Sequence, residues 1–166
     1  MMIQIRIQQG LIPDAKDIRE EVFMKEQGFH QEFDEVDETA WHLVLYEKGE
    51  AVGCCRLFPS DEPDVFILGR LAVRKSCRGR HYGERIVQEA ERWLRSRHVK
   101  KLALSAQVRV QPFYEMLGYT ASGDVYLDEY CPHIHMEKEL FRPFTTAGFA
   151  NRELGQRCLG RDPGGC

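Results

Sequence analysis

The sequence predicts a mixed α/β domain, in which a central β-sheet with parallel and antiparallel strands is flanked by helices. Residues 65–73 are almost all apolar, which is typical of a central strand covered on both faces. Residues 82–97 place apolar side chains on one side of a helix and charged side chains on the other. Near the N-terminus, Ile3, Ile5 and Ile7 alternate with polar residues, which predicts a half-buried first strand.

The remaining elements follow from turn and helix signals. Pro13 begins a helix with apolar residues at helical spacing, and Gly28 is expected to end it before an acidic loop over residues 32–38. Gly118 is expected to close a short helix over residues 110–117. Further strands are expected over residues 41–46, 51–58, 102–105, 119–121 and 132–138. The predicted order is therefore β-α-β-β-β-α-β-α-β-β.

Length and composition predict one folded domain followed by an extension. A chain of 166 residues can bury a core without metal or disulfide support, and 43% hydrophobic residues exclude a disordered chain. We expect the domain to cover residues 1–140. Residues 141–166 contain glycines and arginines without a sustained apolar period, so they are predicted to form a flexible C-terminal extension.

Charge and cysteine content exclude several classes of protein. The net charge of -3 argues against a general nucleic-acid binder, which needs a basic face to displace phosphate counterions. No apolar run approaches the roughly 20 residues that span a bilayer, and residues 1–9 show no signal-peptide pattern. The cysteines include no C-x-x-C pair, which argues against a zinc ribbon or a thioredoxin-type dithiol. We therefore expect a cytoplasmic protein with no nucleic-acid or membrane partner.

The most informative segment joins the apolar strand to the long helix. Residues 78–83 contain two glycines and two arginines immediately before the helix begins. A helix N-terminus presents N–H groups and a partial positive charge, so this loop could bind a phosphate. The alternative is a surface loop whose glycines serve only the turn. The loop matches neither a Walker loop nor a G-x-G-x-x-G dinucleotide fingerprint.

The order of motifs along the chain resembles the GNAT superfamily of acyl-CoA N-acyltransferases. In that order, the apolar strand is followed by the R-G-x-x-x-G loop, the amphipathic helix, a further strand and the segment F-Y-E-M-L-G-Y over residues 113–119. The resemblance covers residues 3–140. Within the superfamily, the chain more specifically resembles the ElaA-type branch, in segments such as residues 19–27 and 128–136. The resemblance implies a GNAT-like fold, with a splayed mixed sheet flanked by helices. It also implies acetyl-CoA as co-substrate and no required metal.

The resemblance further implies where coenzyme A would bind. The strand that pairs with the pantetheine arm in this family corresponds to Leu71, Ala72 and Val73. The pyrophosphate-binding loop and helix start correspond to Arg78, Gly79, Arg80, His81, Tyr82, Gly83 and Glu84. In the family pattern R-x-x-G-x-[GA], His81 stands at the middle glycine. There are two alternatives for this position. The β-carbon of His81 would crowd the phosphate, or the backbone amide of His81 would still donate a hydrogen bond to it normally.

Catalytic residues are also suggested by the resemblance. Tyr114 matches the tyrosine of the motif Y-x-x-x-G-[FY], which in many GNAT enzymes protonates the departing CoA thiolate. Its alternative is a packing tyrosine on a short helix. The general base is open: His133 and Glu26 are candidates, as are Asp37 and His42, and a structural role is the alternative for each.

Acceptor contacts are expected from Gln27, His42, Arg56 and Arg70. The two arginines lie within predicted strands, where an unpaired charge is costly. They would either bind an anionic part of the acceptor or be neutralised by the acidic loop over residues 32–38. That loop could also attract a cationic amine.

The sequence therefore predicts an N-acetyltransferase that moves an acetyl group from acetyl-CoA to a primary amine by direct attack. The acceptor would be a small-molecule amine or a peptide, and a homodimer is a further possibility. Two alternatives stay open. A CoA- or metabolite-binding sensor would need neither Tyr114 nor a base. A metal protein could use Cys131, His133, His135 and Glu137, which share one face if the segment is extended.

Overall fold

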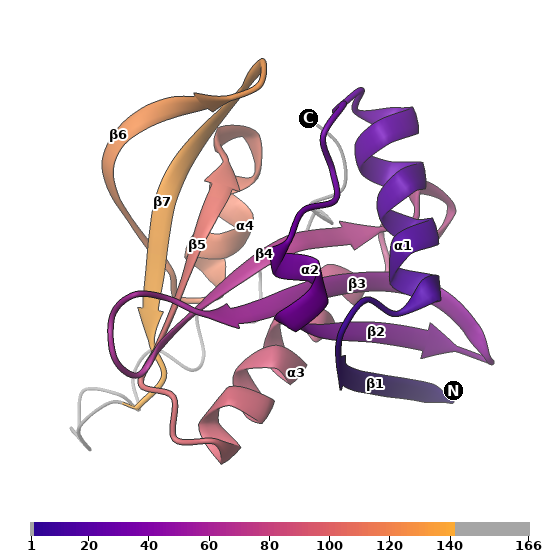
Figure 1. The fold of residues 1–166 in the computed structure, drawn as a ribbon, viewed down its shortest axis with the longest axis horizontal. Helices are drawn as coiled ribbons and strands as arrows, with labels where there is room; N and C mark the ends of the chain where they lie inside the picture. Colours follow the sequence, from indigo (N-terminus) through magenta and orange to yellow (C-terminus); the bar gives the residue numbers. More distant parts are fainter. Residues whose placement is uncertain (1, 142–166) are drawn as a thin grey trace.

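The computed structural model describes residues 2–141, which form a seven-stranded sheet with helices on both faces (Figure 1). The strand order is β1-β2-β3-β4-β5-β7-β6. Neighbouring strands are antiparallel except β4 and β5, which are parallel. The predicted mixed sheet is confirmed, whereas all but the first residue of the extension predicted over residues 141–166 lies outside the described residues.

The strands are somewhat longer than the sequence patterns suggested. Their bounds are β1 (Ile3–Gln9), β2 (Trp41–Glu47), β3 (Glu50–Pro59), β4 (Val65–Val73), β5 (Lys101–Gln107), β6 (Thr120–Asp128) and β7 (Cys131–Glu139). The largest difference is β6, where the expected strand was residues 119–121. Most of β6 is exposed at the edge of the sheet, so it has too few buried apolar residues to show a clear pattern.

The first helix changes type along its length. The α-helix α1 (Pro13–Arg19) continues directly as the π-helix η1 (Glu20–Glu26), and the chain turns at Gly28 with φ +80°. The other helices are α2 (Val36–Thr39), α3 (Tyr82–Ser96) and α4 (Gln111–Met116), with short 3-10 turns η2 (Lys75–Cys77) and η3 (Val108–Val110). A π-helix is rare and is often found near a functional site.

The helices cover opposite faces of the sheet, each above its own apolar cluster. Ile18 and Val22 pack with Val44 of β2 on one face, while Ile86 and Leu94 of α3 pack with the alternate residues of β2 on the other. Gly53 allows α3 to lie directly on β3, because a Cβ there would be 2.6 Å from Ile86 Cδ1. This close packing sets where α3 begins, next to the end of β4.

The sheet is split between β4 and β5. These strands pair from Val65↔Lys101 to Leu68↔Leu104 and separate after that point (Figure 1). The pairing of β3 with β4 changes register between the pairs Cys54↔Ala72 and Arg56↔Gly69. From one pair to the next the chain advances two residues in β3 but three in β4, so β4 contains one extra residue, a β-bulge. Arg70 lies in this bulge with φ +53°. The bulge turns the end of β4 away from β5 and produces the splayed sheet that the family resemblance implied.

Candidate active site

The separation of β4 from β5 opens onto a cavity of about 320 Å³. Its walls combine aromatic, aliphatic and charged side chains from both halves of the sheet. The lining residues are Phe23, Phe29, Gln31, Glu32, Arg56, Phe58, Ile67, Leu68, Gly69, Arg70, Leu71, Ser105, Gln107, Val110, Tyr114, Asp128, Glu129 and His133. Two predicted catalytic residues, Tyr114 and His133, and two predicted acceptor contacts, Arg56 and Arg70, are therefore brought to one cavity.

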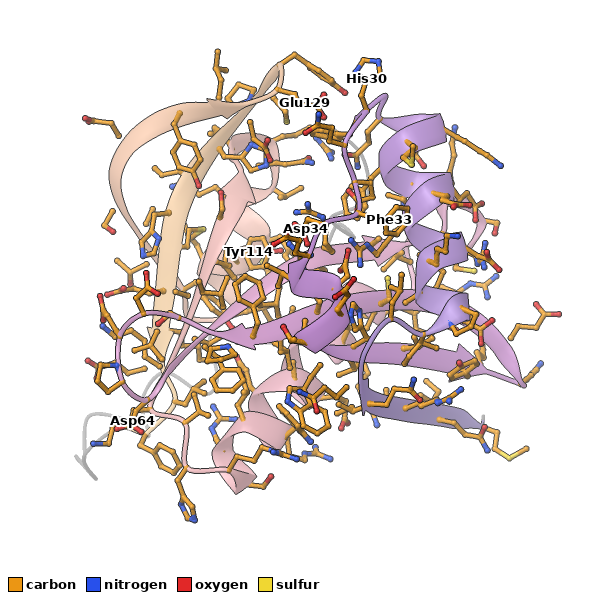
Figure 2. The ribbon with its side chains drawn as sticks, viewed as in Figure 1. His30, Phe33, Asp34, Asp64, Tyr114 and Glu129 are labelled. Atoms are coloured by element: carbon orange, nitrogen blue, oxygen red, sulfur yellow. The ribbon has the colours of Figure 1, made fainter. Side chains whose placement is uncertain are left out.

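Tyr114 lies on α4 and reaches the cavity through the opening in the sheet (Figure 2). Its side chain is buried against Phe113 and Tyr119, with ring centroids 5.0 and 5.8 Å away. Burial raises the pKa of the Tyr114 phenol well above its ordinary value. The group therefore holds its proton at neutral pH and can act as a donor rather than as a base.

His133 lies on β7 and is also buried. Its Nδ1 atom is 2.8 Å from the carbonyl oxygen of Cys131. Because a carbonyl oxygen only accepts hydrogen bonds, Nδ1 carries the proton and Nε2 of the neutral ring is left with a lone pair. The ring also stacks on Tyr126, with centroids 6.2 Å apart. This arrangement holds His133 in the tautomer that a proton acceptor at Nε2 requires.

A buried ionic network forms one side of the cavity. Arg19 is only 1% exposed and binds Glu32 (Nε–Oε1 2.8 Å) and Asp37 (Nη1–Oδ1 2.7 Å). Arg56 binds Asp37 (2.9 Å) and Asp34 (2.6 Å), both through Nη1. Arg70 binds Glu32 through Nε at 3.0 Å. The arginines and carboxylates of this network balance in charge and fix the acidic loop to the sheet.

The carboxylates respond differently to this environment. Burial alone would raise the pKa of Asp37, but hydrogen bonds from Arg19 and from the Asp34 amide hold it well below its ordinary value. Burial raises the pKa of Glu32, and the charges of Arg70 and Arg19 oppose this shift only in part. Asp37 is therefore ionised and structural, which argues against its use as the general base.

The network decides between the two interpretations of the strand arginines. Arg56 and Arg70 are neutralised by the acidic loop, as one interpretation expected, and both still contribute to the cavity wall. His42 is fully buried on β2, and its Nε2 donates to the Asp37 carbonyl oxygen at 3.0 Å. Within residues 2–141, the cavity lining does not include His42, so the structure places it behind the network.

The predicted cofactor loop connects β4 to α3 through η2. His81 is the residue before α3 and has a left-handed backbone with φ +63°. A left-handed backbone is the conformation in which glycine is favoured, because glycine has no β-carbon to strain. Histidine is among the residues that tolerate this conformation, at a cost of about 1 kcal/mol. His81 therefore occupies a backbone conformation that a glycine at this position would adopt without strain.

Charged side chains of the loop have defined partners. Arg80 and Tyr82 both lie against Glu47 of β2, and His81 Nδ1 is 3.5 Å from Glu84. These contacts direct four of the predicted cofactor residues toward β2 and the first turn of α3.

Arg78 faces the other side of the loop and meets Glu26. Its Nε donates to the Val73 carbonyl oxygen at 3.1 Å, and its Nη1 and Nη2 donate to the Glu26 carboxylate at 2.7 and 2.9 Å. The structure thus brings Glu26, a predicted base, to the cofactor loop. Glu26 is not among the described residues that line the cavity.

Two residues near this point were absent from the predicted site. Burial lowers the pKa of Arg109 of η3; the nearby charge of Arg78 lowers it further, and that of Glu26 opposes the shift. Gln107, at the end of β5, lines the cavity and donates through Nε2 to Gln27 Oε1 at 3.0 Å. The available signal was an arginine and a glutamine shortly before Tyr114, but the sequence did not place them near Arg78 or Gln27.

Neither a metal cluster nor a membrane helix is present among residues 2–141. No group of three or more His, Cys, Asp and Glu side chains in this range is arranged to hold a metal ion. His133 is instead bound to the Cys131 carbonyl, and His135 Nε2 is 3.4 Å from Glu137. No helix of these residues is long and apolar enough to cross a membrane.

The fold and the site define the class of protein: an α/β domain whose sheet opens beside the loop that leads into α3, with Tyr114 and His133 at one cavity. The chain belongs to the GNAT family, because the family profile "Acetyltransferase (GNAT) domain" matches residues 11–140. The resemblance stated from the sequence is therefore confirmed.

Individual relatives agree with this assignment. The uncharacterized N-acetyltransferase YjcF of Bacillus subtilis is 34% identical over 131 residues, covering 77% of this chain and 92% of that protein. ElaA of Escherichia coli is 29% identical over 126 residues, covering 73% of this chain and 82% of ElaA. The ElaA crystal structure matches 83% of this chain and 100% of its own with a TM-score of 0.75 and 26% identity. An acyl-CoA N-acyltransferase from Pseudomonas aeruginosa matches 82% of this chain and 99% of its own, with a TM-score of 0.72 and 25% identity.

Proposed function

We propose that this protein is an N-acetyltransferase that moves an acetyl group from acetyl-CoA to a primary amine within a ternary complex. One observation carries the proposal: the cavity at the sheet opening holds a protonated Tyr114 phenol and a His133 ring whose Nε2 can accept a proton. A donor and an acceptor at one cavity are what direct transfer between a thioester and an amine requires.

The coenzyme would lie in the opening between β4 and β5. Backbone groups of Leu71, Ala72 and Val73 would pair with the pantetheine arm, since β4 leaves its partner strand at this point. Arg78 and the start of α3 would hold the pyrophosphate. The fit is supported by the side chain of Glu26, an anion already seated on both terminal nitrogens of Arg78.

The reaction would proceed without a covalent enzyme intermediate. The amine enters unprotonated, and its nitrogen forms a bond to the thioester carbonyl carbon while His133 Nε2 accepts the one proton that this nitrogen loses. The C–S bond then breaks, and Tyr114 donates its proton to the departing thiolate. Products are the amide and free CoA, and the proton held by His133 returns to the phenolate.

The acceptor is expected to be a small-molecule amine or a peptide, and we expect the protein to act in the cytoplasm. Gln27, Arg56 and Arg70 stay candidate acceptor contacts, and a homodimer stays a prediction. Tyr114 and the oriented His133 favour an enzyme over a CoA-binding sensor, which would need neither group.

The proposal is tested by incubating the protein with acetyl-CoA and a panel of primary amines. We expect amine-dependent release of CoA thiol and an equal amount of acetylated product detected by mass spectrometry. A parallel reaction without amine measures background hydrolysis. Tight binding of CoA without transfer to any amine of the panel, including peptide N-termini and lysines, would support the sensor instead.

A further inference from the structure

One segment of the chain crosses the opening between the two halves of the sheet. This segment, residues 26–30, is called the strap below. It follows directly after η1 and contains Gly28, whose φ of +80° marks a sharp turn. Nearly every residue of the strap contacts a different part of the opening, so the strap connects the cofactor loop to the β6–β7 hairpin.

The first contact joins the strap to the cofactor loop. Glu26 binds both terminal nitrogens of Arg78, and the two side chains are 25% and 19% exposed. The two parallel N–H donors of an arginine also suit a phosphate. Glu26 therefore occupies the position on Arg78 that the proposed function assigns to the pyrophosphate. Arg109 lies near this pair and adds a second positive charge. An arriving phosphate would therefore compete with the Glu26 carboxylate.

The second contact joins the strap to the end of β5 and is incomplete. Gln107 donates one hydrogen bond to Gln27, but the Gln27 Nε2 and Gln107 Oε1 atoms are buried without a partner among the described residues. A buried polar atom without a partner is unfavourable, because it has lost its hydrogen bonds to water. The closed strap is therefore held less firmly than the number of its contacts suggests.

The remaining contacts join the strap to the tip of the β6–β7 hairpin. The rings of Phe29 and Tyr130 stack with centroids 5.4 Å apart. The backbone N–H of His30 donates to the Glu129 carboxylate at 3.2 Å, and Figure 2 shows these two residues next to each other. Phe29 and Glu129 also line the cavity, so these contacts close one of its sides.

We propose that coenzyme binding opens the strap: the pyrophosphate replaces the Glu26 carboxylate on Arg78, and the released strap gives the amine access to the cavity. This inference rests on the proposed function, because it takes Arg78 as a phosphate ligand. The strap would turn about Gly28, because a glycine can change its backbone angles without a β-carbon that clashes.

The test measures coenzyme affinity and strap exposure in the same proteins. Glu26→Gln removes the competing charge while keeping the size of the side chain. Glu21→Gln is a matched control, since Glu21 lies on the same π-helix and binds Arg74, the residue that follows β4. Calorimetry gives the Kd for CoA, and hydrogen–deuterium exchange of a peptide covering residues 26–33 reports the His30 amide.

We expect CoA to bind Glu26→Gln about tenfold more tightly than the wild type, while Glu21→Gln stays within twofold of it. CoA should accelerate exchange over residues 26–33 in the wild type, and Glu26→Gln should show the faster exchange before CoA is added. Exchange that CoA slows or leaves unchanged in the wild type overturns the strap mechanism while leaving the coenzyme site intact. Failure of the wild type to bind CoA removes the cofactor assignment itself, and this inference with it.

Discussion

The Nδ1 atom of His133 lies 2.8 Å from the carbonyl oxygen of Cys131, two residues earlier on the same strand. This contact determines which ring nitrogen is protonated, and therefore which one can accept a proton in the cavity. Tyr114 reaches the same cavity from the other face of the sheet, on α4. The bulge in β4 allows this meeting, because a continuous sheet would separate the two side chains.

Replacing Tyr114 with phenylalanine removes the proton donor and keeps the buried ring. We expect kcat to fall about 10²-fold and the Kd for CoA to stay within twofold, since a general acid contributes about 10²–10⁴ to the rate. Tyr119→Phe is the matched control, because Tyr119 packs against Tyr114 but uses its hydroxyl to bind Glu91. Steady-state kinetics and calorimetry would measure both effects. Equal turnover in Tyr114→Phe and wild type would make Tyr114 a packing residue.

Replacing His133 with alanine removes the proposed base. We expect a loss of roughly 10²–10³ in kcat, partly restored by added imidazole, which can accept the proton in the vacated space. His135→Ala serves as the control, because His135 is exposed on the same face of β7 and lies beside Glu137. Imidazole rescue separates a proton acceptor from a structural histidine. A His133→Ala enzyme with unaltered kcat would transfer the role of the base to water or another group.

The left-handed backbone at His81 predicts that glycine is the better residue there. We expect His81→Gly to stabilise the protein by about 1 kcal/mol, which raises Tm by about 2–4 °C, and to bind CoA at least as tightly as wild type. His98→Gly is the control, since His98 has φ +62° outside the cofactor loop. It should raise Tm similarly without changing the Kd. Weaker CoA binding by His81→Gly would show that the imidazole itself contacts the coenzyme.

Removing the Asp37 carboxylate should destabilise the fold strongly. Asp37→Asn leaves Arg19 and Arg56 with less negative charge around them, and we expect a loss of about 3 kcal/mol in the free energy of unfolding at pH 7. Asp64→Asn is the control, because Asp64 is exposed and 3.6 Å from Lys100, so its loss should cost under about 0.5 kcal/mol. Urea unfolding would measure both values. A cost for Asp37→Asn no larger than that of the control would mean the network is dispensable.

The same network predicts how stability depends on acid. The pKa of Asp37 is lower in the folded protein than in the unfolded chain, so its stabilising contribution is present above about pH 4. That contribution decreases as the pH falls toward the folded pKa. The raised pKa of Glu32 acts in the opposite direction. We expect the difference in unfolding free energy between wild type and Asp37→Asn to shrink between pH 5 and pH 3. A difference that is constant across this range contradicts the assignment.

Local patterns were sufficient for the elements whose side chains face a core along their whole length. Strand β4 and helix α3 have continuous or periodic apolar residues, and the loop between them has its own glycine and arginine pattern. Strand β6 lacked such a pattern because it is exposed at the sheet edge. Arg19 looked like an ordinary charged helix residue, and only its pairing with Glu32 and Asp37 explains its burial.

The sequence by itself determined the family, the order of the main elements and the position of the glycine- and arginine-containing loop before α3, since these depend on short-range periodicity and on motifs. The tertiary structure decided which candidates meet. It brought Tyr114 and His133 to one cavity, placed Glu26 on Arg78, and moved His42 behind the ionic network. These outcomes depend on one extra residue in β4 and on contacts between distant segments. Neither leaves a periodic signal along the chain, because both arise from how the strands and the strap are placed against each other in space.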